Sequence, residues 1–231
     1  MLALVKFTPF LGAVFICWIF SVCIHEFAHA LVAYWGGDRS VRERGYLRLD
    51  PLAYIHPVTS ILVPLAFLAL GGIPLPGGAV RIDVSALRSK LWASLVSAAG
   101  PVANLLLFAG IVVVIHPRSG IIDPTAAVQP TWVRLLGAMA VLELMSVFFN
   151  LIPVPPLDGF GMIEPYLSYE TRMRVARMGW MGLIVLYVVF FRLDAVMTGF
   201  MDLVDVVLQW CGLPFELTWR QYNIALFGHS A

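Results

Sequence analysis

The chain consists of long apolar runs separated by short polar stretches. Crossing the roughly 30 Å hydrocarbon core of a bilayer takes a helix of about 20 mainly apolar residues. Runs of this length predict membrane-spanning helices, and a run with polar residues on one face predicts an amphipathic helix. The predicted fold class is an all-α polytopic membrane protein with about five to six transmembrane helices. We expect spanning helices at 8–35, 88–116, 131–152 and 174–192, and a more amphipathic helix at 195–211.

A shorter apolar stretch at 57–73 differs from these runs, because it contains Pro64 and ends in a segment rich in Gly and Pro. Arginines and a lysine flank it on both sides, and such residues favour the cytoplasmic face of a membrane. The stretch is therefore predicted to dip into the membrane and return as a re-entrant element. Short alternation at 39–50 predicts strands beside it. The flanking basic residues are Arg39, Arg42, Arg44, Arg48, Arg81, Arg88 and Lys90.

Composition supports an integral membrane protein. The chain is 60% hydrophobic and 13% charged, with a mean hydropathy of +0.87, whereas a soluble domain has about 25% charged residues. Continuous apolar segments exclude a β-barrel, whose strands alternate. A net charge of +1 gives no indication of nucleic-acid binding. The three cysteines, Cys17, Cys23 and Cys211, have no paired spacing and are interpreted as apolar helix residues.

The first apolar run contains the pentapeptide His25-Glu26-Phe27-Ala28-His29. On a helix, this spacing places two imidazoles one turn apart on one face, which suits a single Zn²⁺. Glu26 can act as the general base that takes a proton from the attacking water. Ionisable residues at membrane depth are costly without partners, so such a cluster indicates a functional site.

Two other interpretations of this segment are weaker. A secretory signal peptide would use Lys6 as its charged start and cleave at Ala28-His29-Ala30. A single lysine is a weak charged start for a signal peptide, and the later apolar segments resemble membrane spans just as closely as the first one does. A pair of histidines packed between helices is the second alternative, and the motifs further along the chain argue against it.

Zinc needs a third protein ligand and an open position. Asp158 lies where an apolar helix breaks, after Pro153, Pro155 and Pro156 and before Gly159. Prolines cannot continue the helix, and glycine permits an unusual turn. Other candidates remain at this point, although each of the histidines among them precedes a proline and is more typical of a loop or interface residue. These candidates are His56, His116, Glu143 and Glu164.

Three motifs together resemble the site-2 protease family of intramembrane zinc metalloproteases. They are His25-Glu26-x-x-His29, Ala99-Gly100-Pro101-x-x-Asn104 and Asn150-x-x-Pro153-x-Pro155-x-x-Asp158-Gly159. The resemblance covers residues from about 10 to 192, in the family's order. One departure is that the family often has Asp-Gly-Gly, whereas Phe160 and then Gly161 follow Gly159 here.

The resemblance implies a set of roles. His25, His29 and Asp158 would be the ligands of one Zn²⁺ per chain, and Glu26 would be the catalytic base. Asn104 and Asn150 would support the substrate or the transition state. The segment from about 39 to 83 would correspond to the family's membrane-embedded β and re-entrant region. The expected location is the cell membrane, multi-pass, with the active site towards the cytoplasmic side.

The leading functional hypothesis is an endopeptidase that cuts single-pass membrane proteins within the bilayer or near its cytoplasmic end. The alternative is a zinc-binding membrane protein without proteolysis, such as a partner-binding or transport subunit, which would have no use for Glu26. A zinc protease acting on soluble substrates is disfavoured by the buried motif. One membrane-embedded domain is expected over 1–231, with a C-terminal amphipathic helix and tail at 195–231. A PDZ or CBS domain, as many family members carry, is not expected.

Overall fold

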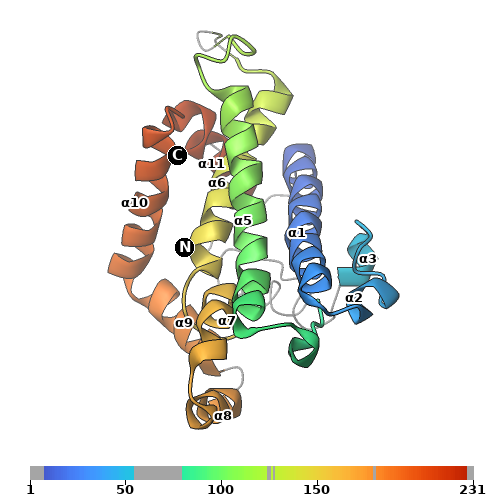
Figure 1. Ribbon diagram of the computed structural model, residues 1–231. Helices are drawn as coiled ribbons and strands as arrows, with labels where there is room; N and C mark the ends of the chain where they lie inside the picture. Colours follow the sequence, from blue (N-terminus) through green and yellow to red (C-terminus); the bar gives the residue numbers. More distant parts are fainter. Residues whose placement is uncertain (1–7, 55–79, 124–125, 127, 179–180, 228–231) are drawn as a thin grey trace. The chain divides into compact units, whose positions relative to one another are not determined.

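The computed structural model describes residues 8–54, 80–123, 126, 128–178 and 181–227, and every regular element in these ranges is helical. Figure 1 shows the elements in chain order. The α-helices are α1 Pro9–Gly36, α2 Ser40–Glu43, α3 Pro51–Tyr54, α5 Lys90–Ile115, α6 Thr131–Asn150, α7 Asp158–Ile163, α8 Tyr169–Met178, α9 Met181–Arg192, α10 Asp194–Trp210 and α11 Trp219–Phe227. Three short 3₁₀ turns accompany them: η2 Val84–Ala86, η3 Glu164–Tyr166 and η4 Phe215–Leu217.

Three of the described helices, α1, α5 and α6, are long and apolar enough to cross a membrane. They have 28, 26 and 20 residues, and at about 1.5 Å per residue even the shortest reaches about 30 Å. The helices predicted at 8–35, 88–116 and 131–152 are therefore confirmed. Up to four spans result if the bent pair of α9 and α10 counts as one. A total of five to six stays a prediction.

Both ends of α1 are set by local chemistry. Thr8 caps the helix, because its Oγ1 accepts the N–H of Leu11 at 3.0 Å, and Pro9 follows at the first helical position. At the other end Gly37 has φ of +125°, and the N–H of Asp38 reaches back to the carbonyl of Ala33 at 3.0 Å. This pairing is the Schellman pattern of helix termination. The sequence therefore ends α1 two turns after the His-Glu-x-x-His motif.

Residue contacts divide the chain into two compact units. The first comprises 1–21, 105–145 and 198–231. In this unit the run Ala138–Met145 of α6 is buried throughout, as in a helix at the centre of a bundle. A Cβ at Gly137 would overlap the carbonyl of Leu217, so α6 needs glycine where it meets η4. The first unit is thus a packed helical body around α6.

The second unit comprises 22–104 and 146–197 and contains the His-Glu-x-x-His motif together with Asp158. Part of α1, the segment after it and the start of α5 enclose a small apolar cluster. Its buried members are Ala30, Ala33, Val41 and Val96, with Val32, Tyr34, Tyr46, Leu47, Val80, Ile82 and Leu87 packed against them.

The prediction of strands at 39–50 is wrong. This segment instead forms α2 and a series of turns, and the described residues contain no strand. Asp38 explains the outcome, because its Oδ1 accepts the backbone N–H of Ser40 at 3.0 Å and its hydroxyl at 2.6 Å. A bond from an aspartate to the N–H two residues later is an Asx-turn, which here leads into α2. One apolar residue of the alternating pattern, Val41, is nevertheless buried in the apolar cluster.

The predictions for 57–73 and for the chain after residue 173 have different outcomes. The amphipathic helix at 195–211 is confirmed as α10. A single spanning helix at 174–192 is not confirmed, because α9 has only 12 residues, or about 18 Å. Helix α11 lies where only a tail was expected. The re-entrant stretch at 57–73 lies outside the described residues.

Candidate metal centre

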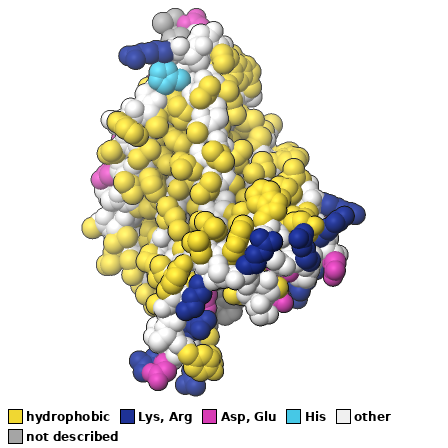
Figure 2. Space-filling model, viewed as in Figure 1, with side chains coloured by type: hydrophobic (Ala, Val, Ile, Leu, Met, Phe, Trp, Pro, Cys, Tyr) yellow, Lys and Arg dark blue, Asp and Glu magenta, His cyan; other side chains and the backbone are white. Residues whose placement is uncertain are grey.

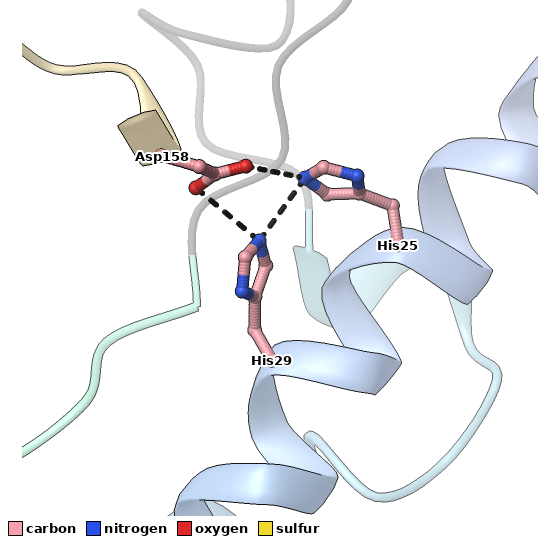
Figure 3. A group of neighbouring side chains, drawn as sticks. All are labelled: His25, His29 and Asp158. Carbon is pink, nitrogen blue, oxygen red and sulfur yellow. Dashed lines mark hydrogen bonds and ion pairs between the residues drawn. The ribbon is translucent and has the colours of Figure 1, made fainter. Parts of the chain in front are cut away.

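His25 and His29 point from α1 towards Asp158, the first residue of α7 (Figure 3). The two Nε2 atoms lie 3.0 Å apart. Oδ2 of Asp158 lies 3.2 Å from Nε2 of His25, and Oδ1 lies 3.4 Å from Nε2 of His29. Among the described residues, this is the group of three His, Cys, Asp or Glu side chains whose atoms converge closely enough to hold a metal ion. All three residues belong to the second unit.

These separations match a tetrahedral zinc site. Zinc binds imidazole nitrogen and carboxylate oxygen at about 2.0–2.2 Å, which places neighbouring ligand atoms about 3.3–3.4 Å apart. The observed spacings between the ligand atoms of His25, His29 and Asp158 run from 3.0 to 3.4 Å. Three protein ligands in this geometry leave a fourth corner open for water or substrate, as in catalytic zinc sites.

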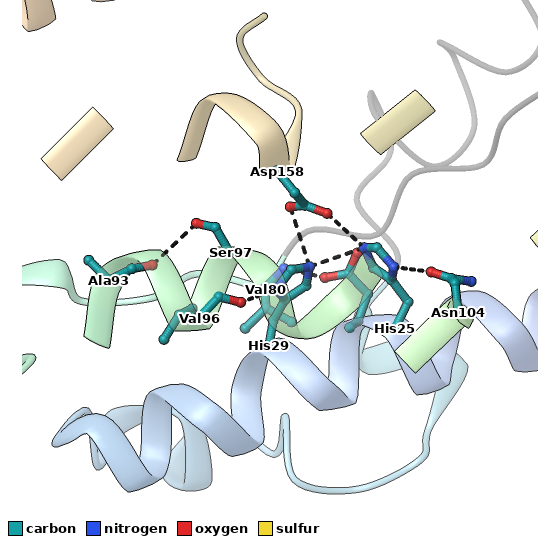
Figure 4. Close-up of polar contacts among 9 residues, drawn as sticks. His25, His29, Val80, Ala93, Val96, Ser97, Asn104 and Asp158 are labelled. Carbon is teal, nitrogen blue, oxygen red and sulfur yellow. Dashed lines mark hydrogen bonds and ion pairs between the residues drawn. The ribbon is translucent and has the colours of Figure 1, made fainter. Parts of the chain in front are cut away.

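The protonation of the two imidazoles follows from their second nitrogens (Figure 4). Nδ1 of His29 lies 2.6 Å from the carbonyl oxygen of Val96, and Nδ1 of His25 lies 2.5 Å from Oδ1 of Asn104. Both partners are acceptors, so each Nδ1 donates its N–H, and a neutral imidazole in this tautomer presents a lone pair at Nε2. Such partners on the second nitrogen are typical of metal-binding histidines.

Two lone pairs and a carboxylate that face one another repel unless a cation lies between them. Oδ2 of Asp158 is also buried without a hydrogen-bond partner. A buried, unsatisfied carboxylate oxygen is unfavourable, and coordination to a metal satisfies it. The donor set, its spacing and this oxygen therefore all fit a zinc ion.

Asp158 reaches the site because the chain breaks after α6. Leu157 is extended, with φ of −73° and ψ of 157°, and α7 begins at the next residue. Gly159 lies against the end of α6, where a Cβ would overlap the carbonyl oxygen of Leu151. The proline-rich segment therefore redirects the chain, and glycine lets the start of α7 fold back onto it.

Helix α5 holds α7 in place. The hydroxyl of Ser94 donates to the carbonyl of Met162 at 2.6 Å. A Cβ at Gly161 would lie 2.5 Å from Oγ of Ser97. This contact gives a physical reason for glycine at residue 161. The glycine that follows Phe160 is the one that packs against α5.

Gly100 forms the floor beneath the two imidazoles. A Cβ at this position would lie 2.5 Å from Cε1 and Nε2 of His25 and closer still to Nε2 of His29. The α5 backbone can approach the ligand nitrogens only without a side chain at residue 100. The Gly-Pro part of the second sequence motif thus has a structural role at the site.

Glu26 is buried, with 7% of its surface exposed. Its Oε2 accepts the backbone N–H of Val80 at 3.2 Å. Asp38 holds the same segment further along, because its Oδ2 accepts the N–H of Asp83 at 2.8 Å. The segment 80–83 therefore donates a backbone hydrogen bond to a carboxylate at each of its ends.

The remaining predicted residues lie elsewhere. Asn150 is the last residue of α6 and is half-buried, and its supporting role stays a prediction. Glu164 is exposed in η3, and Glu143 is buried in the first unit. Nδ1 of His116 accepts the N–H of Arg118 at 2.9 Å. His56 lies outside the described residues.

Sequence reasoning missed the Val96 carbonyl and the Val80 N–H. Both are backbone groups, and their positions depend on packing rather than on residue type. Pro101 was the available signal nearby, because its missing N–H removes the helical partner of the Ser97 carbonyl, next to Val96.

Similar proteins were found by sequence. The chain is 40% identical over 171 residues to "Putative zinc metalloprotease Rip2" of Mycolicibacterium smegmatis, covering 74% of this chain and 63% of the relative. The Mycobacterium tuberculosis protein of the same name is 40% identical over 173 residues, 75% of this chain and 64% of the relative. "Putative zinc metalloprotease YwhC" of Bacillus subtilis is 33% identical over 176 residues, 74% of this chain and 77% of the relative.

The chain thus spans slightly less than two thirds of the length of the Rip2 proteins and about three quarters of YwhC. No family model matches the sequence, and no solved structure matches it.

Proposed function

The chain belongs to the site-2 protease family of intramembrane zinc metalloproteases, and we propose that it is a zinc endopeptidase acting on single-pass membrane proteins. The bond cut would lie within the membrane or near its cytoplasmic end. The observation that carries this proposal is the convergence of His25, His29 and Asp158, with both Nδ1 protons already directed to acceptors on α5.

His25, His29 and Asp158 would hold the Zn²⁺. When bound, this ion supplies Lewis-acid chemistry that polarises the scissile carbonyl and acidifies the attacking water. The chain's own contribution is geometric, because the three ligands come from α1 and α7 and are braced by α5. Partners of this kind would hold the ligand side chains in fixed orientations.

Glu26 would take the proton from the attacking water and return it to the leaving amine. One of its carboxylate oxygens already accepts the Val80 N–H, which leaves the other oxygen to face the reaction. Glu26 directly follows His25, so the proposed base and two of the three proposed ligands lie on one helix.

A peptide bond in a membrane helix is protected, because its backbone is paired and water is absent. In the segment 153–157 the N–H groups of Val154 and Leu157 are already bonded, to the carbonyls of Ile152 and Val154. What the segment could offer a substrate is therefore the carbonyls of its prolines. It is the surface on which an unwound, extended substrate would pair by strand addition, with Asn150 nearby in sequence to hold the backbone or the oxyanion.

The proposed setting is the cell membrane, with several crossings and the active site towards the cytoplasm. Exposed apolar side chains on the long helices suit contact with lipid, as the face drawn in Figure 2 illustrates. Arginines follow α1 and precede α5, which by the positive-inside rule favours a cytoplasmic location for these ends.

The test is a comparison of Glu26→Gln with Glu43→Gln, which alters an exposed carboxylate in α2. With a helical single-pass test substrate, Glu26→Gln should retain zinc and fold but lose turnover by several orders of magnitude. Glu43→Gln should cleave as the parent does. Near-normal cleavage by Glu26→Gln would overturn the proteolytic mechanism.

Single-pass proteins that co-purify with the inactive Glu26→Gln variant would identify the substrate class. If neither the parent nor any variant cleaves, while zinc binds, the protein is a zinc-binding membrane protein of another kind.

A further inference from the structure

Three residues of α5 at intervals of four form a stripe against the metal centre. Residues four apart lie on one face of a helix. Val96 supplies a backbone carbonyl to His29, Gly100 supplies the space beneath both rings, and Asn104 supplies a side-chain oxygen to His25. The stripe thus contacts both imidazoles.

Asn104 is the member of this stripe whose contribution resides in a side chain. It is 2% exposed, and its Oδ1 lies 2.5 Å from Nδ1 of His25. His25 is itself buried. Without an acceptor at this position the Nδ1–H would be left unsatisfied in an apolar environment, which is unfavourable.

We infer that Asn104 is a positioning residue for the metal centre, whose Oδ1 holds His25 in the tautomer and ring orientation that direct the Nε2 lone pair at the metal. This inference deepens the proposed function and rests on it for the identity of the metal. It differs from the role in substrate or transition-state support that the family resemblance implies for Asn104.

The two roles make opposite predictions. If Oδ1 of Asn104 orients a metal ligand, its removal changes the metal affinity, and this change can be measured without substrate. A residue that holds substrate acts on KM or kcat and leaves metal affinity unchanged. Loss of an outer partner of a metal-binding histidine typically weakens metal affinity or activity by about 10–100-fold. The difference is therefore large enough to measure.

The experiment measures Zn²⁺ affinity of the full purified chain by competition with a chelator, without substrate. Asn104→Leu keeps the approximate volume and removes the acceptor, whereas Asn104→Asp keeps an acceptor oxygen. Val102→Ala, at an exposed position of the same helix, is the control for substitution in α5. We expect about 10–100-fold weaker zinc binding for Asn104→Leu, and affinity within about threefold of the parent for the other two.

Two further measurements separate positioning from general damage. In the Co²⁺-substituted protein, the visible absorption bands, which report the ligand geometry, should change for Asn104→Leu and be preserved for Asn104→Asp. Cleavage by Asn104→Leu should recover at saturating Zn²⁺, with KM unchanged. If Asn104→Leu does not fold, Asn104→Gln, which displaces the oxygen by one methylene, replaces it in the same comparison.

Unchanged zinc affinity in Asn104→Leu together with a raised KM or lowered kcat would overturn the inference in favour of substrate support. Equal weakening in Asn104→Asp and Asn104→Leu would also overturn it, because an acceptor oxygen would then not suffice. Absence of proteolysis in every variant, with the expected order of zinc affinities, would refute the proposed function and leave the positioning role of Asn104 standing.

Discussion

Gly100 of α5 lies so close to Nε2 of His29 that a methyl group on its Cα would overlap that nitrogen. We therefore expect Gly100→Ala to displace the imidazole and to abolish zinc retention. Gly110, on the same helix, has no atom within 4 Å of the position that an added methyl group would occupy, so Gly110→Ala is the matched control. The measurement is the zinc content of each protein after gel filtration in detergent.

The control variant should bind one Zn²⁺ per chain, because alanine in a helix is tolerated at least as well as glycine. Full zinc content in Gly100→Ala would show that α1 and α5 can separate without loss of the site. The close approach would then not be needed for metal binding.

The contact between Gly161 and Ser97 leads to a second prediction. Gly161→Ala should push α7 away from α5, and so lower zinc affinity and the melting temperature, because the new Cβ would lie 2.5 Å from Oγ of Ser97. Ser97→Gly removes that oxygen and its Cβ together, so the double variant should recover zinc affinity relative to Gly161→Ala. A double variant as weak as Gly161→Ala would mean that the clash lies elsewhere.

The ligand set can be tested residue by residue. The purified protein should contain about one Zn²⁺ per chain, and His25→Ala, His29→Ala and Asp158→Ala should each lose it or bind it much more weakly. Glu164→Ala is the comparison, because Glu164 is an exposed carboxylate six residues beyond Asp158. Full zinc retention by Asp158→Ala would remove the third ligand and make Glu164 or His56 the next candidate.

The sequence predicted the long helices well because each depends on a property that is local and repeated. About 20 apolar residues satisfy both the helix and the bilayer, and Thr8 and Gly37 set the ends of α1 through contacts within a few residues. The strand prediction at 39–50 was wrong because of another local interaction. Asp38 forms a turn with Ser40 that leads into α2, and this local interaction outweighed a weak alternation of apolar residues.

For the site, the sequence indicated the side chains but not the backbone groups. His25, Glu26, His29 and Asp158 could be proposed from the sequence because metal binding and base chemistry require particular side chains. The Val96 carbonyl and the Val80 N–H could not be found, because every residue other than proline carries the same backbone groups. Only the packing of α5 and of the segment 80–83 against α1 selects which ones are used.

Membrane orientation gives a fourth prediction. Both Arg48 and Arg88 are exposed, and the stretch between them, at 57–73, was predicted to return to the side from which it enters. Single cysteines at these two positions, in a chain without Cys17, Cys23 and Cys211, should react only with a reagent admitted to the cytoplasm. Labelling of position 88 from outside would show that 57–73 crosses the membrane, and the topology after it would be inverted.

The last prediction concerns how a substrate is chosen. Each backbone group that is unpaired in lipid costs several kcal/mol, so exposing the scissile bond is the hard step. Gly, Pro or Asn near the cut lowers that cost, because these residues weaken a helix. Selection should therefore depend on the instability of the substrate helix more than on a side-chain pocket.

The measurement is a cleavage series in one test substrate, with a helix-breaking pair near the cut replaced by Leu-Leu and then restored elsewhere in the same turn. We expect the Leu-Leu version to be cut far more slowly and the restored version to recover, because restoring the pair elsewhere in the turn again frees backbone groups close to the cut. The parent enzyme and Glu26→Gln are compared throughout, so that only cleavage that depends on Glu26 is counted. Equal rates for the original and the Leu-Leu version would show that unwinding is not the selecting step. Recognition would then lie in substrate side chains or in a partner protein.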